Sequence, residues 1–181
     1  MLKSNLQSSF EEFCKNKKFE INDEQLRIID SIEKFINPKK TFLKNFFNKR
    51  DELCFYLHGN VGVGKTMLMD FVYNELEIKK YRLHFNEFMI SFHDFRHEKE
   101  DYNSIRSFVK NLKKQYELIY LDEFQVTNIV DAMILGKLFE VIFSENIKII
   151  ITTNIKLNDL YKDGLQQEQF LPFISIIKNF S

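Results

Sequence analysis

The chain has 181 residues, with 26 Lys and Arg against 26 Asp and Glu, so its formal net charge is zero. This length suits one domain with a sizeable core, and the charge balance argues against a strongly basic nucleic-acid-binding protein. The only cysteines are Cys14 and Cys54, which excludes a disulfide scaffold and suits a reducing compartment. No apolar run reaches the roughly 18 residues of a membrane-spanning helix, and no signal or transit peptide is recognisable. We therefore expect a cytoplasmic protein.

The first predicted element is a helix that begins at Asp23, because apolar residues recur there at helical spacing. Asn37-Pro38 ends this pattern. A lysine-rich connection then leads to a predicted strand at residues 53–57. We accordingly predict an N-terminal helical and linker region over residues 1–50, followed by one core over residues 51–181.

A glycine-rich segment after the first strand is the most informative part of the sequence. It has the pattern G-x-x-x-x-G-K-T, and a helical pattern over residues 67–73 follows it. Strand, loop and helix in this order indicate a phosphate-binding loop rather than a chance match. Glycines let the backbone amides approach a phosphate at the helix N-terminus. We expect Lys65 to contact the β- and γ-phosphates of ATP and Thr66 to hold Mg²⁺. The predicted nucleotide-binding residues are Gly59, Asn60, Val61, Gly62, Val63, Gly64, Lys65 and Thr66.

Strand and helix patterns alternate through the rest of the chain. A second strand is predicted at residues 81–85, with helical patterns from Phe88 and again over residues 104–112. The apolar run at residues 117–123 predicts a third strand, and a helix over residues 129–143 leads to a fourth strand at residues 147–154. This order predicts an α/β fold with a mainly parallel sheet, arranged in three αβα layers as in P-loop NTPases.

Polar residues follow two of the predicted strands. Asp122 ends the third strand in the manner of a Walker B acid, which orients Mg²⁺, and Glu123 is then the candidate general base for the attacking water. Asn154 ends the fourth strand, where it can sense the γ-phosphate. Ligands of parallel sheets bind at the carboxyl ends of the strands, so these residues and the glycine-rich loop are expected at one edge. A simpler explanation stays open for both: Asp122 and Glu123 could be surface acids at a strand end, and Asn154 could be a turn-forming residue. His84 and His93 stay open between structural and functional roles.

Five stretches of the sequence resemble the AFG1-like ATPase family. They are residues 59–70, 121–127, 131–135, 160–166 and 170–174. The Asp-Glu-Phe-Gln-Val-Thr run within them is far more specific than the phosphate loop alone. The resemblance implies an AAA+ fold, ATP hydrolysis with Mg²⁺, and self-association into a ring or other oligomer. It also implies work in bacterial cell division or in membrane protein quality control, in the cytoplasm or peripherally at the inner membrane.

The sequence departs from the family pattern in two respects. Gln167 stands where the family usually has Arg, and Ile155 and Leu157 stand where Arg and Pro usually follow the sensing Asn. The family also continues past the last residue of this chain. We therefore expect a sheet without its fifth strand, no helical lid, and a completing C-terminal partner. Two alternatives stay open: a nucleotide-binding remnant or interaction module with little turnover, and another nucleotide-driven machine of the same fold, such as a helicase loader.

Overall fold

The structure is a computed structural model that divides into two compact units. It describes residues 5–38, 52–60, 64–98, 103–162, 164 and 167–181. One unit comprises Met1–Lys49 and Val61–Ile78, and the other comprises Arg50–Asn60 and Lys79–Ser181. The chain therefore leaves the second unit and returns to the first within the glycine-rich loop. The division at residue 50 that the sequence suggests stays a prediction.

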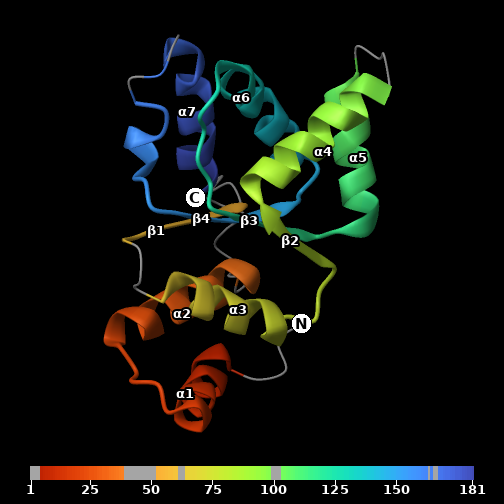
Figure 1. The fold of residues 1–181 in the computed structure, drawn as a ribbon. Helices are drawn as coiled ribbons and strands as arrows, with labels where there is room; N and C mark the ends of the chain where they lie inside the picture. The colour runs from red at the N-terminus through yellow and green to blue at the C-terminus, as the bar shows by residue number, and fades with distance from the viewer. Residues whose placement is uncertain (1–4, 39–51, 61–63, 99–102, 163, 165–166) are drawn as a thin grey trace, which may run out of the picture. The chain divides into compact units, whose positions relative to one another are not determined.

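The described residues of the first unit form the helices α1 (Leu6–Lys17), α2 (Asp23–Ile36) and α3 (Lys65–Glu75) (Figure 1). Asn5 and Asn22 cap α1 and α2, because each side chain accepts a hydrogen bond from a first-turn amide. The ring of Phe71 on α3 lies 5.1 Å from the ring of Phe10 and 5.2 Å from that of Phe13, both on α1. Aromatic contacts thus join α1 to α3. The predicted start of α2 at Asp23 is confirmed, whereas the sequence analysis did not predict α1.

The second unit is built on a parallel sheet of four strands. These are β1 (Cys54–His58), β2 (Lys80–His84), β3 (Leu118–Asp122) and β4 (Lys148–Thr153). Their order in the sheet is β1-β4-β3-β2, so β1 and β2 form its edges among the described residues. All three strand pairs are parallel. The structure confirms the four expected strands and the predicted α/β fold.

Four helices cover one face of this sheet: α4 (Phe85–Glu98), α5 (Ser104–Gln115), α6 (Ile129–Ser144) and α7 (Leu171–Phe180) (Figure 1). Two short 3₁₀ helices, η2 (Leu157–Asp159) and η3 (Gln167–Gln169), precede α7. In the core, Ile119 and Ile149 of the sheet belong to the same packed cluster as a group of buried phenylalanines. Among these, Phe124 stacks on Phe173 with ring planes 6° apart. Burial of this apolar surface fixes the strand ends that carry the candidate site.

The junction between β2 and α4 differs from the prediction. The sequence indicated a strand through Phe85 and a helix from Phe88, but the strand ends at His84 and the helix begins at Phe85. Two contacts explain the abrupt change. The backbone amide of His84 donates to the Glu87 carboxylate at 3.1 Å, which caps the helix, and the Phe85 ring lies 4.2 Å from the Phe124 ring in the core.

Candidate functional site

The glycine-rich loop begins and ends on described elements. Gly59 and Asn60 directly follow β1 in the second unit, and the Gly59 amide donates to the Thr153 carbonyl at 3.2 Å. Gly64 is the N-cap of α3 in the first unit, and Lys65 and Thr66 are the first two residues of that helix. Val61, Gly62 and Val63 lie outside the described residues. The expected succession of strand, loop and helix is therefore present along the chain.

The backbone at Gly64 shows why a glycine stands there. Its φ of +82° lies in the left-handed region that side chains disfavour. A Cβ at this position would also lie 3.0 Å from the Gln25 Nε2 atom of α2. Because glycine has no side chain with which to cap α3, the first-turn amides of this helix are suited to an anion.

Asp122 is held between the two strands that flank β3. Its Oδ2 atom accepts a hydrogen bond from Arg82 Nε at 2.5 Å, and its Oδ1 atom accepts one from Thr152 Oγ at 2.9 Å. The side chains of Arg82 and Asp122 are only 19% and 17% exposed. The sequence analysis did not single out Arg82, since only the register of β2 against β3 reveals it.

Glu123 adopts an unusual backbone conformation directly after β3. Its φ is 53°, in the left-handed region, and its side chain is 83% exposed. The next residue fixes this turn: the Phe124 amide donates to the Thr152 carbonyl at 2.9 Å, and the Phe124 carbonyl accepts from Thr153 Oγ at 2.7 Å. A non-glycine residue in this region costs about 1–3 kcal/mol and persists only where its surroundings impose it. The result is a carboxylate directed outward, with His84 Nδ1 3.7 Å from its Oε2 atom.

Asn154 follows β4 at the same edge of the sheet. The register pairs His58 with Thr153 and His84 with Asp122, so the four strands end close to one line. The Tyr56 hydroxyl donates to the Ile155 carbonyl at 2.8 Å, which ties the segment after β4 to β1. Burial raises the pKa of this hydroxyl well above its ordinary value. The second unit thus brings together Gly59, Asn60, Asp122, Glu123 and Asn154 at one edge.

The residue types at this edge fit a phosphate-bound magnesium ion. Within the part of the chain that the structure describes, no group of three or more His, Cys, Asp or Glu side chains could hold a metal. Mg²⁺ bound with phosphates keeps several waters and needs only one or two protein oxygens. The Asp122 carboxylate, at this edge of the second unit, is an oxygen donor of that kind.

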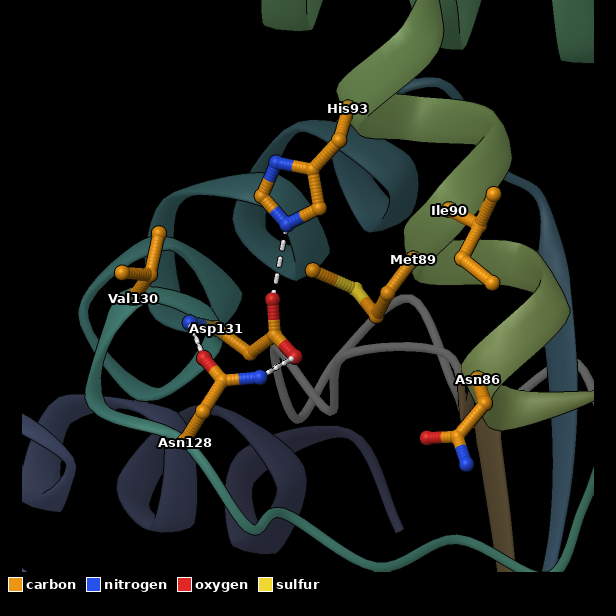
Figure 2. Close-up of a pocket in the computed structure, with 7 residues that line it drawn as sticks. All are labelled: Asn86, Met89, Ile90, His93, Asn128, Val130 and Asp131. Atoms are coloured by element: carbon orange, nitrogen blue, oxygen red, sulfur yellow. Dashed lines mark hydrogen bonds and ion pairs between the residues drawn. The ribbon is translucent and has the colours of Figure 1, made fainter.

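His93 belongs to a separate pocket on α4 and the start of α6. Its Nε2 atom lies 2.8 Å from Asp131 Oδ1, and Asn128 Nδ2 donates to Asp131 Oδ2 at 2.6 Å (Figure 2). The Asn128 side chain also caps α6 by accepting from the Asp131 amide. The cavity has a volume of about 510 Å³, and Met89 and Val130 add apolar walls. These contacts account for His93 as a structural residue that holds α4 to α6.

Comparison with known proteins identifies the family. The model of the AFG1-like ATPase family matches residues 9–181. The chain belongs to this family. The resemblance of the glycine-rich loop and of the segment around Asp122 is thereby confirmed, and the family is of the ATPase type.

Two curated relatives place the match in a longer context. Lactation elevated protein 1 homolog B of Danio rerio is 40% identical over 139 residues, which are 70% of this chain and 28% of the relative. Cell division protein ZapE of Escherichia coli (strain K12) is 38% identical over 125 residues, 68% of this chain and 33% of ZapE. The chain therefore spans about a third or less of the length of these relatives.

Solved structures support the fold. The chain matches the crystal structure of DnaI with a TM-score of 0.57 and 18% identity, covering 91% of this chain and 84% of DnaI. It also matches the replication initiator DnaA bound to AMPPCP and single-stranded DNA, with a TM-score of 0.59, 18% identity, and coverage of 87% and 46%. At these identities the likeness is one of fold alone, a parallel sheet with flanking helices. Among the described residues, every helix is too short or too polar to cross a bilayer.

Proposed function

We propose that this chain binds ATP with Mg²⁺ and hydrolyses it at the carboxyl edge of its sheet. The observation that carries the proposal is the arrangement of this edge: Asp122 ends β3, Glu123 and Asn154 directly follow β3 and β4, and the glycine-rich loop begins after β1, the neighbour of β4. Ligands of parallel sheets bind at this position. Membership of the AFG1-like ATPase family supports the same activity.

Each residue has a distinct role in this proposal. The amides of residues 59–66 and the Lys65 ammonium bind the phosphates, and Thr66 and Asp122 hold Mg²⁺ directly or through its waters. Glu123 accepts a proton from the water whose oxygen attacks the γ-phosphorus, while the bond to the bridging oxygen breaks and ADP leaves. The outward direction and high exposure of Glu123 suit contact with a water. Asn154 senses the γ-phosphate from the end of β4.

Calorimetry tests the binding step. Titration of the 181-residue chain with ATP and Mg²⁺ is expected to show saturable binding close to one nucleotide per chain. Lys65→Ala removes the charge that contacts the phosphates and is expected to abolish this binding. Lys34→Ala is the matched control, since Lys34 is a 73% exposed lysine on α2. Unchanged ATP affinity in the Lys65 variant would show that the site is wrongly assigned.

Phosphate release tests the chemical step. Glu123→Gln keeps the shape of the side chain but cannot accept the proton, so we expect intact ATP binding and a loss of turnover of about 10²–10⁴-fold. The control is Glu140→Gln on the surface of α6, where the side chain is 58% exposed. Turnover that survives in the Glu123 variant would assign the base to another group.

One sequence feature favours a second candidate, a chain that binds nucleotide with little turnover. Gln167 is exposed on η3, at the position where the family usually has Arg. An arginine that completes a neighbouring site contributes a factor of about 10³–10⁵ to phosphoryl transfer. ATP binding without measurable phosphate release, together with release after Gln167→Arg, would establish this alternative.

The cellular role that we propose follows the curated relatives and the family. ZapE is named a cell division protein, and we propose work of that kind or in membrane protein quality control, by a cytoplasmic protein or one peripheral to the bacterial inner membrane. Self-association, or a partner that completes the sheet beside β1, belongs to the same proposal. Sedimentation of the chain with and without ATP tests self-association, and cell fractionation tests the location.

A further inference from the structure

Two residues of β2 face the acidic end of β3. The register pairs His84 with Asp122 and Arg82 with Tyr120. Residues two apart on a strand share a face of the sheet, so Arg82 and His84 lie on the same face as Asp122. Arg82 is therefore the diagonal neighbour of Asp122, at a separation that only a long side chain spans. The 2.5 Å contact between Arg82 Nε and Asp122 Oδ2 shows that this side chain does span it.

The two oxygens of Asp122 have partners on opposite sides. Arg82 on β2 donates to Oδ2, and Thr152 on β4 donates to Oδ1 at 2.9 Å. An ionised carboxylate has about four acceptor positions, so two remain for further donors such as metal-bound water. The Asp122 side chain is also 17% exposed, a setting in which an ionised carboxylate needs a cation or hydrogen-bond donors. Arg82 supplies both.

We propose that Arg82 is a positioning residue for magnesium binding: it holds the Asp122 carboxylate in the orientation that the waters of Mg²⁺ need. This inference rests on the proposed function, because Asp122 is the magnesium-binding acid there. Partners of this kind fix the rotamer of a metal ligand before the metal arrives. Without Arg82, the Thr152 hydrogen bond is the one that the carboxylate keeps among the described residues, and the carboxylate turns toward solvent.

A guanidinium beside a metal ligand also has an opposing effect on metal binding, so the test has two directions. A guanidinium beside the carboxylate adds positive charge where Mg²⁺ would bind, so it could weaken the metal by repulsion. Orientation and repulsion predict changes of opposite sign in magnesium affinity. We favour orientation because Asp122 Oδ1 is held by Thr152 at the same time, which leaves the carboxylate with a single fixed geometry.

The test compares ATP affinity with and without metal. Calorimetry measures the Kd of ATP in the presence of EDTA and again in excess Mg²⁺. The Kd in EDTA divided by the Kd in Mg²⁺ reports how much the metal strengthens ATP binding. In Arg82→Gln we expect this ratio to fall about 10–100-fold, which is the usual effect of losing a partner of a metal ligand. The Kd in EDTA should stay as in the unaltered chain, and a merely structural role of Arg82 would not produce this split.

Two further variants control the experiment. Arg82→Lys keeps the positive charge but loses the planar donor, so we expect a smaller fall in the ratio than in Arg82→Gln. Lys80→Gln removes a cation that lies two residues before Arg82 on the same face of β2, further from Asp122. It should leave the ratio unchanged. Circular dichroism checks that each variant folds, and if Arg82→Gln does not, the comparison of Arg82→Lys with Lys80→Gln decides.

The outcomes separate this inference from the proposed function. No ATP binding by the unaltered chain would refute the proposed function and this inference with it. Binding whose metal ratio is the same in all variants would refute the inference alone. A ratio that rises in Arg82→Gln would show that Arg82 repels the metal, which also overturns a positioning role.

Discussion

Asp131 lies in a stretch that resembles the AFG1-like family, and in the structure its contacts join α4 to α6. Its contribution to the stability of the second unit can be measured. Its carboxylate is 10% exposed and bonded on both oxygens, to His93 on α4 and to Asn128 at the start of α6. Asp131→Ala removes both contacts and leaves His93 Nε2 and Asn128 Nδ2 without the carboxylate that they contact. We therefore expect this substitution to lower the stability of the second unit without changing ATP affinity.

The size of the effect follows from the two hydrogen bonds. A hydrogen bond to a charged group contributes about 1.5–3 kcal/mol, and the low end applies here because His93 is 29% exposed. Two bonds at the low end give a loss of about 3 kcal/mol. For a chain of this length, each kcal/mol lowers Tm by about 2–4 °C, so the expected fall is about 6–12 °C.

Thermal unfolding followed by circular dichroism measures this change. Glu140→Ala on the exposed side of α6 serves as the control and should change stability by less than about 0.5 kcal/mol. Combining Asp131→Ala with His93→Ala should cost less than the two single losses together, because the residues share one interaction. A stable Asp131 variant that has lost ATP affinity would refute the reasoning and move Asp131 into the functional site.

Two further predictions concern pH and the glycine-rich loop. Burial raises the pKa of the Cys54 thiol to about 12, from 9.0 in an unperturbed thiol, and raises that of the Tyr56 hydroxyl as well. A group whose pKa is higher in the folded than in the unfolded state contributes its full stability at a pH below the unfolded-state pKa, and loses it as pH rises to the folded-state pKa. The free energy of unfolding should therefore fall as pH rises from about 9 to about 12. Denaturant titrations check this, and a slope that Cys54→Ala leaves unaltered would contradict the part assigned to the thiol. Gly64→Ala should cost about 1–2 kcal/mol of stability, because it combines a φ of +82° with a close contact to Gln25 Nε2. Urea titration measures this cost, and an unaffected midpoint would mean that the loop rearranges freely.

The strands were predictable because their signals are local. β1, β3 and β4 are short apolar runs bounded by polar residues, and the burial of Ile119 and Ile149 agrees with this. The start of α2 was equally clear from the apolar residues that recur at helical spacing after Asp23. By contrast, α1 was not predicted, although its buried Leu6, Phe10 and Cys14 recur at helical spacing.

The side-chain pairs of the site could not be predicted in this way. Arg82 and Asp122 meet only because β2 and β3 pair in one register, and a shift of one residue would place them on opposite faces. His93 and Asp131 likewise meet because α4 and α6 pack on the same side of the sheet. The left-handed backbone of Glu123 is imposed by hydrogen bonds from Phe124 and Thr153, which cannot be predicted from the local sequence.

The strand order has a consequence for the way in which the second unit assembles. Neighbours β3 and β4 are linked by a short stretch of chain, with Leu118 beside Lys148, whereas Cys54 of β1 pairs with Ile149 about 95 positions away. Closing a loop about three times longer costs about 1 kcal/mol more entropy. We therefore expect β1 to join the sheet last, and its amides to exchange with deuterium before those of β3. The strand that leads into the glycine-rich loop would then be the last part of the sheet to form during folding.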